Sequence, residues 1–442
     1  MEIVVDIETS PDHVGLPIVR IKIPGESTPC IIRADYAMLG KICSSPSPAV
    51  LDLLNLAMVV YAVDRSVLRQ TADDSWTRQI TLTLPVFLME QWQRANPILN
   101  KCLSFLTGDL WKVDFTQNTL DPILGLRSLP IKGIPQTDAV SLFSGGLDSL
   151  IGVIDWLEQH QRGSLLLVGH HDPRIAGPYT DQVATYKDLQ PHYQRRTHPL
   201  FFAVGANFGW DTTLRSRSLL FMALGLYVAN SISSKTPLLV PENGNMALNV
   251  PLTPSRRGSC STRTVHPYYL LLLRRVIEEL GILNPIENPL ELKTKGECVT
   301  DCLNLEVLKS TLGDTASCAK RGHKRTWVRR HARECGRCLP CIYRRAGLHT
   351  ANLDYQTYGS DICTGEVNLL SDYMYANDFR ALVSFLRQNL LEEEISKLLL
   401  SNGSLELDRL SEYSGLIKRA MGEVRRLIND KGITEVKQQI KL

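Results

Sequence analysis

Hydrophobic and polar positions follow three different patterns along the chain. In the first 132 residues, short alternating segments typical of strands are mixed with two longer stretches that have helical spacing. Strands are expected at residues 3–7, 19–23, 79–84 and 111–115, and helices at 48–63 and 87–106. This mixture predicts an N-terminal α+β domain over residues 1–132, which ends in a loop rich in turn formers at 129–135.

From Asp138 onward, short apolar segments alternate with helical patterns. Strands are expected at residues 139–143, 165–168, 200–204 and 238–240, with a weaker one near Leu290. The apolar positions after the first strand recur at helical spacing, as expected for a helix packed on a sheet: Leu147, Leu150, Ile151, Ile154 and Leu157. Alternation of strand and helix indicates a parallel sheet with crossover helices. We therefore expect a doubly wound α/β domain over residues 133–346.

The remaining region, residues 347–442, is expected to be mostly helical. Apolar stripes predict helices at 379–391, 393–400 and 407–428, and Asn402 with Gly403 forms a plausible stop between the last two.

Composition and charge place few constraints on function. The 442 residues are 44% hydrophobic and 21% charged, with a net charge of only +3, which is typical of a globular protein without a global preference for nucleic acid or membrane. The first residues lack the basic and apolar runs of a secretory signal, and no stretch reaches the ~20 apolar residues that cross a bilayer. Eleven cysteines are too sparse for a disulfide scaffold, so a reducing cytoplasm is the expected compartment.

A glycine-rich loop lies between the first strand and the first helix of the predicted α/β domain. Its residues are Ser144, Gly145, Gly146, Leu147, Asp148 and Ser149. In this position backbone N–H groups and the positive end of a helix meet an anion, and the glycines let the backbone approach a phosphate. The serine hydroxyls can donate to phosphate oxygens, while Asp148 is a candidate helix cap or Mg²⁺ ligand. The loop is neither a Walker loop nor a Rossmann motif, and the alternative is an ordinary capped turn.

Three cysteines with C-x2-C-x2-C spacing, Cys335, Cys338 and Cys341, follow a fourth, Cys318. Four thiolates suit tetrahedral Zn²⁺, and C-x2-C turns present two sulfurs toward one point. Free cysteines and an iron–sulfur cluster are the alternatives. His323, His331 and Cys302 are possible substitutes for the more distant Cys318.

Basic residues surround these cysteines, opposed nearby only by Glu334. They are Lys320, Arg321, Lys324, Arg325, Arg329, Arg330, Arg333, Arg337, Arg344 and Arg345. Such a run forms either a solvated face or a contact for phosphate, nucleic acid or an acidic protein. Aromatic residues are scarce here, which disfavours a stacking platform for single strands.

The phosphate loop and the later cysteine motif together resemble the QueC family, the 7-cyano-7-deazaguanine synthases, over residues 138–346. These enzymes are ATP pyrophosphatases of the adenine nucleotide alpha hydrolase-like type. The long N-terminal unit and the loop after the fourth strand look most like the QueC-like QatC group of the Qat anti-phage defence system. The resemblance implies ATP, Mg²⁺ and Zn²⁺ as cofactors. It also implies adenylation of a carboxylate, a 7-deazapurine acid or a related group, for attack by a nitrogen nucleophile.

The resemblance also implies roles for individual residues. ATP would be bound by Ser144, Gly145, Gly146, Asp148 and Ser149, and zinc by Cys318, Cys335, Cys338 and Cys341. The implied catalytic residues are Asp148, Arg217 and Lys295, with Lys293 as a rival of Lys295. His170 and His171 follow the second strand, where this fold usually meets adenine, and strand capping is their alternative role.

The chain departs from the family pattern in three places. Ser218 replaces an Asn that follows the family's Arg, the spacing between Cys318 and Cys335 is long, and a longer loop after the fourth strand replaces the short substrate loop. In that loop Arg263 is a candidate for binding a carboxylate, and His266 is a candidate proton acceptor or a structural histidine.

Several partners and functions remain open from the sequence. The extra N-terminal unit and the lengthened loop favour a protein partner encoded nearby, with a small-molecule 7-deazapurine possible, nucleic acid less favoured and no membrane. The alternatives to the adenylating enzyme are a tRNA-modifying ATP pyrophosphatase and a nucleotide-binding module that recognises a partner with little turnover.

Overall fold

A computed structural model describes residues 1–9, 17–43, 46–118, 135–207, 209, 211, 213–256, 263–370 and 374–441. Most of the turn-rich loop predicted at 129–135 therefore lies outside the described residues. Residues 257–262 of the longer loop after the fourth predicted strand lie outside them as well.

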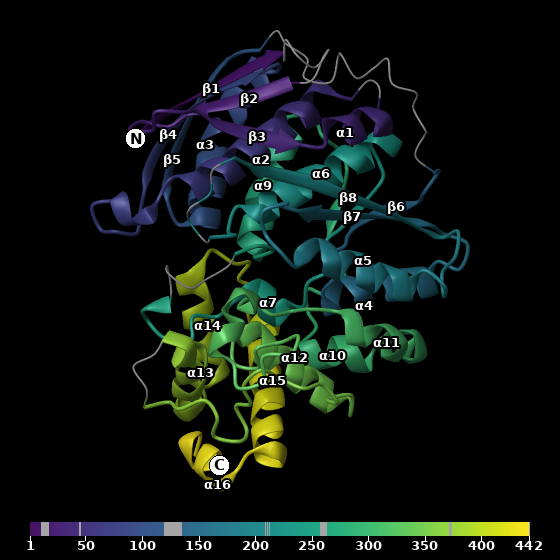
Figure 1. The fold of residues 1–442 in the computed structure, drawn as a ribbon, viewed down its shortest axis with the longest axis vertical. Coiled ribbons are helices and arrows are strands. Elements are labelled where there is room, and N and C mark those ends of the chain that lie inside the picture. The colour runs from purple at the N-terminus through teal and green to yellow at the C-terminus, as the bar shows by residue number, and fades with distance from the viewer. Residues whose placement is uncertain are drawn as a thin grey trace.

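Ten strands of the described residues form a single sheet, in the order β10-β9-β6-β7-β8-β3-β2-β1-β4-β5 (Figure 1). Their bounds are β1 Glu2–Thr9, β2 Pro17–Lys22, β3 Cys30–Ala34, β4 Gln79–Val86, β5 Leu110–Gln117, β6 Ala139–Leu142, β7 Leu165–His171, β8 Thr197–Ala206, β9 Leu238–Leu239 and β10 Ile286–Glu287. Most neighbouring strands are parallel, and the antiparallel pairs are β8 with β3, β3 with β2, and β2 with β1. The expected α/β class with a mostly parallel sheet is confirmed.

The junction between the N-terminal strands and the rest of the sheet is the pairing of β3 with β8. Ile32 lies opposite Ala206, and Ala34 opposite Val204. The strand β3 was not predicted, whereas the other N-terminal strands begin or end close to the predicted positions. Because β3 pairs with β8, the N-terminal strands extend the sheet of the α/β region.

Helices cover both faces of the sheet (Figure 1). One face carries α2 Pro48–Ser66, α3 Met89–Thr107, α6 Arg217–Ile232 and α9 Pro267–Glu279, with the short α1 Tyr36–Ile42 beside them. The other carries α4 Leu147–Gln159, α5 Pro178–Leu189, α10 Lys295–Thr300, α11 Leu305–Thr311 and part of α12 Leu339–Thr350. The alternation within β6 explains this division, because Val140 and Leu142 pack with the first set and Ala139 with the second.

The C-terminal region is helical, as predicted, and has its own apolar core. Its helices are α13 Asn377–Gln388, α14 Glu392–Asn402, α15 Leu410–Lys431 and α16 Thr434–Gln439. The stop expected at Asn402 and Gly403 is confirmed, because α14 ends at Asn402. The core also includes Leu248 of the short helix α7 Gly244–Leu248 and Ile342 of α12, so the C-terminal helices pack against elements that follow β9.

The order of the parallel strands reverses at β6, and we call the region outside the carboxyl ends of β6 and β9 the crevice. From β6 the chain proceeds to β7 and β8 on one side, and then crosses to β9 and β10 on the other. In open α/β sheets, ligands bind outside the carboxyl ends of the strands at such a reversal. The loops that follow β6 and β9 meet there.

Candidate nucleotide site and cysteine cluster

The predicted phosphate loop lies between β6 and α4, as expected. Gly146 is the N-cap of α4. The Ser149 hydroxyl lies 3.2 Å from that of Ser144, accepts from the Ser144 N–H at 3.3 Å and donates to the Gly146 carbonyl at 2.9 Å. These bonds close a tight turn whose N–H groups lie at the positive end of a 13-residue helix, an arrangement that suits an anion.

Gly145 is required by packing as well as by any approach of a phosphate. Its φ of +77° is left-handed, and a Cβ at this position would lie 2.7 Å from the Asp181 carbonyl carbon and 2.8 Å from the Gln182 nitrogen. Its carbonyl accepts from the N–H of Ala316 at 3.0 Å and from the hydroxyl of Thr185 at 3.4 Å. The loop is therefore braced by α5 and by the segment that leads to Cys318.

Asp148 connects three segments at the crevice. One carboxylate oxygen accepts from the Lys295 ammonium at 2.6 Å, and the other accepts from the Asn243 side-chain amide at 2.8 Å. Asn243 follows β9, and its own side chain also caps α7 by accepting from the Met246 N–H. The structure thus brings a carboxylate, an ammonium and an amide together at the loop.

Lys295, and not its rival Lys293, contacts the loop. Lys295 opens α10 behind a capping box in which Thr294 and Glu297 exchange side-chain and backbone bonds of 3.0 and 2.9 Å. The Lys295 side chain is only 6% exposed, whereas Lys293 pairs with Asp301 at 3.1 Å and is 35% exposed. Because α10 begins at Lys295 directly after its cap, the side chain of Lys295 contacts Asp148.

Glu242, at the end of β9, adds a second carboxyl group to the crevice. One of its oxygens accepts from the Thr264 hydroxyl at 3.1 Å. Burial and the nearby Asp148 charge raise its pKa to about 7, against the opposing effects of Lys295 and the Thr264 hydrogen bond. This carboxyl group therefore changes its charge near neutral pH.

Arg217 lies at the first turn of α6, close to the end of β7. Its Nε donates to His170 Nδ1 at 3.2 Å and one terminal nitrogen donates to the His170 carbonyl at 2.7 Å. His170 Nε2 in turn donates to the Val204 carbonyl at 3.0 Å, so the imidazole is a neutral tautomer, and burial and Arg217 hold its pKa well below 6.5. The same His170 carbonyl accepts from the Gln182 amide at 3.1 Å. Because the Gln182 backbone packs on Gly145, Gln182 and the His170 carbonyl link Arg217 to the loop.

Arg263 and His266 occupy structural positions. The Arg263 guanidinium donates to the Phe105 carbonyl at 2.7 Å and lies over the Phe105 ring. His266 is fully buried and caps α9, because its Nδ1 accepts from the Tyr268 N–H at 3.1 Å. Burial and Arg263 lower the pKa of His266 to about 3. The substrate roles of both residues stay predictions, and the burial of His266 weighs against a proton acceptor.

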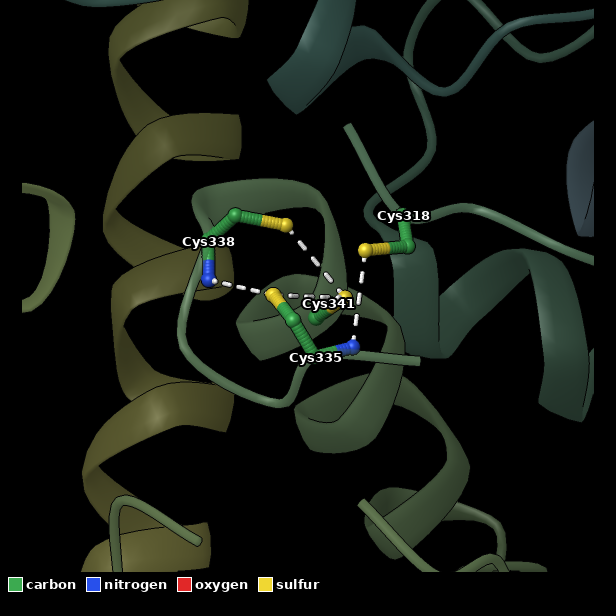
Figure 2. A group of neighbouring side chains, drawn as sticks. All are labelled: Cys318, Cys335, Cys338 and Cys341. Carbon is green, nitrogen blue, oxygen red and sulfur yellow. Dashed lines mark hydrogen bonds between the residues drawn. The ribbon is translucent and has the colours of Figure 1, made fainter. Parts of the chain in front are cut away.

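The four predicted metal ligands form one cluster. The Sγ atoms of Cys318, Cys335, Cys338 and Cys341 all lie within 4.8 Å of one another (Figure 2). Backbone N–H groups point at these sulfurs, since Cys335 donates to Cys318 at 3.4 Å and Cys338 donates to Cys335 at 3.3 Å. Such bonds stabilise thiolates, so the arrangement can hold a metal ion such as zinc.

The turn of the cysteine motif depends on Gly336. Its φ is +76°, and a Cβ there would lie 2.4 Å from the Ser360 carbonyl oxygen. Glu334 is also buried at the cluster, where it accepts from the Cys341 thiol at 3.0 Å and from the Ser317 N–H at 2.7 Å. This carboxylate ties the segment before Cys318 to the cysteine motif.

Acidic residues distant in sequence neutralise much of the basic run. Arg321 pairs with Asp181, and Arg333 with Asp181 and Asp314. Arg344 pairs with Glu334 at 3.9 Å. The other paired arginines of the run have acidic partners after α12: Arg329 with Glu366, and Arg345 with Asp354 and Asp361. The exposed cations left without an ion pair among the described residues are Lys320, Lys324, Arg325 and Arg330. The local excess of charge in the sequence is therefore much smaller on the surface.

Sequence reasoning missed several residues of the site. Glu242 and Asn243 begin the longer loop just after the fourth predicted strand but were not singled out as site residues. The carboxyl ends of parallel strands face the same side of a sheet as the predicted phosphate loop, so their position was an available signal. Asp181 had no such signal, because its role depends on the packing of α5 against the loop. Glu334 directly precedes Cys335 and was noted only as the one acidic residue near the basic run.

Comparison with known proteins assigns no family to the chain. No protein-family model, curated protein or solved structure matches it. Among the residues that the structure describes, no helix is both long and apolar enough to span a bilayer.

Proposed function

We propose that the protein binds ATP at the loop of residues 144–149 and transfers AMP to a carboxylate, with release of pyrophosphate. The observation that carries this proposal is the contact of Asp148 with both Lys295 and Asn243 at the strand-order reversal. A fixed ammonium beside a helix N-terminus is the arrangement that stabilises phosphate charge. The resemblance of the loop to ATP pyrophosphatases supports cleavage between the α and β phosphates.

The residues of the crevice have separable roles in this proposal. The N–H groups at the start of α4 and the Ser144 and Ser149 hydroxyls would bind phosphate oxygens, with the Ser149 proton turning away from the Gly146 carbonyl to do so. Lys295 neutralises charge on the leaving pyrophosphate, and Arg217 supplies a second cation from the β7 side. The Asp148 oxygen that accepts from Lys295 has one hydrogen bond and a further lone pair, whereas the other oxygen accepts from both the N–H and the side-chain amide of Asn243. The first oxygen therefore suits Mg²⁺, which would screen the phosphate charge.

We assign zinc to the cysteine cluster, in a structural role. Four sulfur donors complete a tetrahedral ion and leave no position for a substrate. The cluster lies beside the segment whose Ala316 N–H binds the Gly145 carbonyl. Zinc would therefore stabilise the segment at Ala316 that contacts Gly145, and it would take no part in the chemistry.

The substrate that we propose is a 7-deazapurine acid or a related carboxylate, attacked by a nitrogen nucleophile in anti-phage defence with a partner protein encoded nearby. The choice of substrate, nucleophile and partner rests on the resemblance to the QueC family. A tRNA substrate is less favoured, because the arginines at positions 321, 329, 333 and 345 are engaged in internal ion pairs.

Incubation with α-labelled ATP tests the proposal. Wild-type protein and Asp148→Asn are compared with no addition, with deazapurine acid and ammonia, with tRNA, and with the products of neighbouring genes. Labelled AMP and pyrophosphate should appear with the wild type only, and the acceptor that accelerates them identifies the substrate. Release of ADP, or AMP formation that is equal in Asp148→Asn, would contradict the assignment. ATP binding without turnover under every condition would favour the partner-recognition module.

A further inference from the structure

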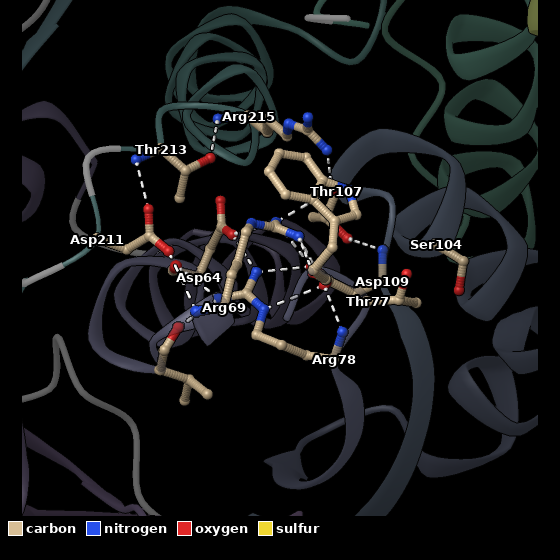
Figure 3. Close-up of polar contacts among 12 residues, drawn as sticks. Asp64, Arg69, Thr77, Arg78, Ser104, Thr107, Asp109, Asp211, Thr213 and Arg215 are labelled. Atoms are coloured by element: carbon tan, nitrogen blue, oxygen red, sulfur yellow. Dashed lines mark hydrogen bonds and ion pairs between the residues drawn. The ribbon is translucent and has the colours of Figure 1, made fainter. Parts of the chain in front are cut away.

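The start of α6 is held by a residue from the N-terminal region. Asp64, near the end of α2, accepts from both the N–H and the hydroxyl of Ser216 at 3.2 and 2.7 Å through the same oxygen. Both residues are fully buried. The neighbouring Arg215 donates to the Thr107 carbonyl at 2.7 Å (Figure 3). Two consecutive residues just before the first turn of α6 are therefore bound to the N-terminal region.

The orientation of Asp64 is itself fixed by two buried arginines. Its second oxygen accepts from Arg69 at 3.3 Å and from Arg78 at 2.5 Å. Both arginines also bind Asp109, at 2.8 and 2.6 Å (Figure 3). Asp64 and Asp109 therefore share the same arginines, but of the two only Asp64 has a hydrogen bond to Ser216.

The residue after Asp64 holds the other side of Arg217. Arg65 pairs with Asp172, which directly follows β7 and also accepts from the Tyr61 hydroxyl at 3.3 Å. Two residues earlier, His170 binds the Arg217 guanidinium through its ring and its carbonyl. Asp64 and Arg65, near the end of α2, therefore contact the two segments that determine where Arg217 lies. These segments are the start of α6 and the end of β7.

Arg217 has no carboxylate partner in the part of the chain that the structure describes. Its donors are directed to His170, and burial lowers the pKa of its guanidinium. Asp172 acts on Arg217 electrostatically from beyond ion-pair distance, but it is itself paired with Arg65. The positive charge is therefore not matched one for one, and an anionic ligand would supply the missing charge. Gln182 links Arg217 to the loop, because its amide shares the His170 carbonyl with Arg217 while its backbone packs on Gly145, and a phosphate of the bound nucleotide is the anion that fits.

We infer that Asp64 is a positioning residue that fixes the start of α6, and through it Arg217, at the nucleotide site. The N-terminal region would then complete this site within the same chain, in addition to any contact with a partner. The inference rests on the proposed function, because it assigns Arg217 to the ATP-bound state.

A double-mutant cycle with a matched control tests the inference. Asp64→Asn, Arg217→Ala, their combination and Asp109→Asn are compared for MgATP affinity at equilibrium and for melting temperature. Asp64→Asn and Asp109→Asn both weaken the same arginine pairs, so both should lower the melting temperature. Only Asp64→Asn should weaken MgATP binding, by about tenfold or more. In the Arg217→Ala background it should have no further effect on affinity, since the two residues act through one link.

Two outcomes would overturn the inference. One is an equal loss of MgATP affinity in Asp64→Asn and Asp109→Asn, which would mean that general destabilisation is responsible. The other is a further loss when Asp64→Asn is added to Arg217→Ala. A wild-type protein that binds no MgATP would overturn the proposed function, and this inference with it. If the wild type binds MgATP, either of the two outcomes above overturns the inference alone. Ser216→Ala, which removes only the 2.7 Å hydroxyl bond, gives the same comparison if Asp64→Asn does not fold.

Discussion

The Lys295 ammonium lies 2.6 Å from an Asp148 carboxylate oxygen, although 147 residues separate the two along the chain. The pair joins the first turn of α4 to the first turn of α10, outside the carboxyl end of β6. Because both side chains are mostly buried, the charge at the loop is set by their contact and by the ligand more than by solvent.

Replacement of the two neighbouring lysines should have very different effects. We expect Lys295→Met to lower AMP formation by about 100-fold or more, because a fixed cation at the phosphates is removed. Lys293→Met, whose ammonium pairs with Asp301 near the surface, should stay within about twofold of the wild type. Release of AMP and pyrophosphate measures both, with circular dichroism as the check on folding. Similar losses in the two variants would mean that the contact with Asp148 is not what matters.

Gly145→Ala should disrupt the phosphate loop. The new methyl group would meet the backbone of α5 at 2.7 Å in a left-handed conformation, so we expect a loss of about 1–3 kcal/mol in the free energy of unfolding and a loss of ATP binding. Gly322→Ala is the control, because a Cβ there has no neighbour within 4 Å. Denaturant titration and equilibrium binding measure the two effects. Normal stability of the Gly145→Ala variant would show that α5 can move away from the loop.

Purified protein should contain about one zinc ion per chain, measured by elemental analysis. Cys335→Ser should lower both the zinc content and the melting temperature, because a structural metal site contributes to folding. Cys302→Ser should keep its zinc, since Cys302 lies outside the cluster and contacts the Asn304 carbonyl instead. Iron in place of zinc, or zinc lost from Cys302→Ser, would contradict the assigned ligands.

His266 should make the protein sensitive to acid. Its pKa is about 3 in the folded protein against 6.5 ordinarily, so the fold favours the neutral ring. The stability that this shift contributes is present above pH 6.5 and is lost as the pH falls toward 3. At pH 5 the loss amounts to about 2 kcal/mol.

His266→Asn keeps a side-chain acceptor for the cap of α9 but removes the titration. We therefore expect a smaller fall in the free energy of unfolding between pH 7 and pH 5 than in the wild type, measured by denaturant titration at each pH. The exposed His323→Asn serves as the control and should behave as the wild type does. An unchanged pH dependence in His266→Asn would show that other groups govern acid unfolding.

The sequence predicted individual elements better than their arrangement. Helices with long apolar stripes, such as α2 and α15, and the strands β6 to β9 were found because local periodicity reports burial on one side or both. β3 was missed, since its five residues Cys30–Ala34 carry little periodic signal. The fifth strand of the α/β region was expected near Leu290 but lies at Ile286–Glu287, where two residues are too few for a pattern.

At the candidate site, the features that depend on local motifs were predicted, whereas contacts between residues far apart in the sequence were not. The glycine-rich loop lies between β6 and α4 as expected, although its binding of phosphate stays a prediction. The four cysteines come together as expected, with Cys318 in the cluster despite its distance from Cys335. The acidic partners of Arg321 and Arg333 could not be predicted, because Asp181 reaches them only through the packing of α5. Likewise, no pattern in α2 indicates that Asp64 binds Ser216, 152 residues away.

The pairing of β3 with β8 also affects how the chain folds as it leaves the ribosome. Ile31 and Asn207, joined across this junction by a 2.6 Å hydrogen bond, are 176 residues apart. At a synthesis rate of about 5–20 residues per second, β3 waits on the order of ten to thirty seconds for its partner. During that interval its edge and the apolar surface of α2 are uncovered, which is the condition under which nascent chains aggregate or recruit chaperones. Folding of the N-terminal region is therefore coupled to the synthesis of β8, and ribosome stalling before residue 206 leaves that strand edge open.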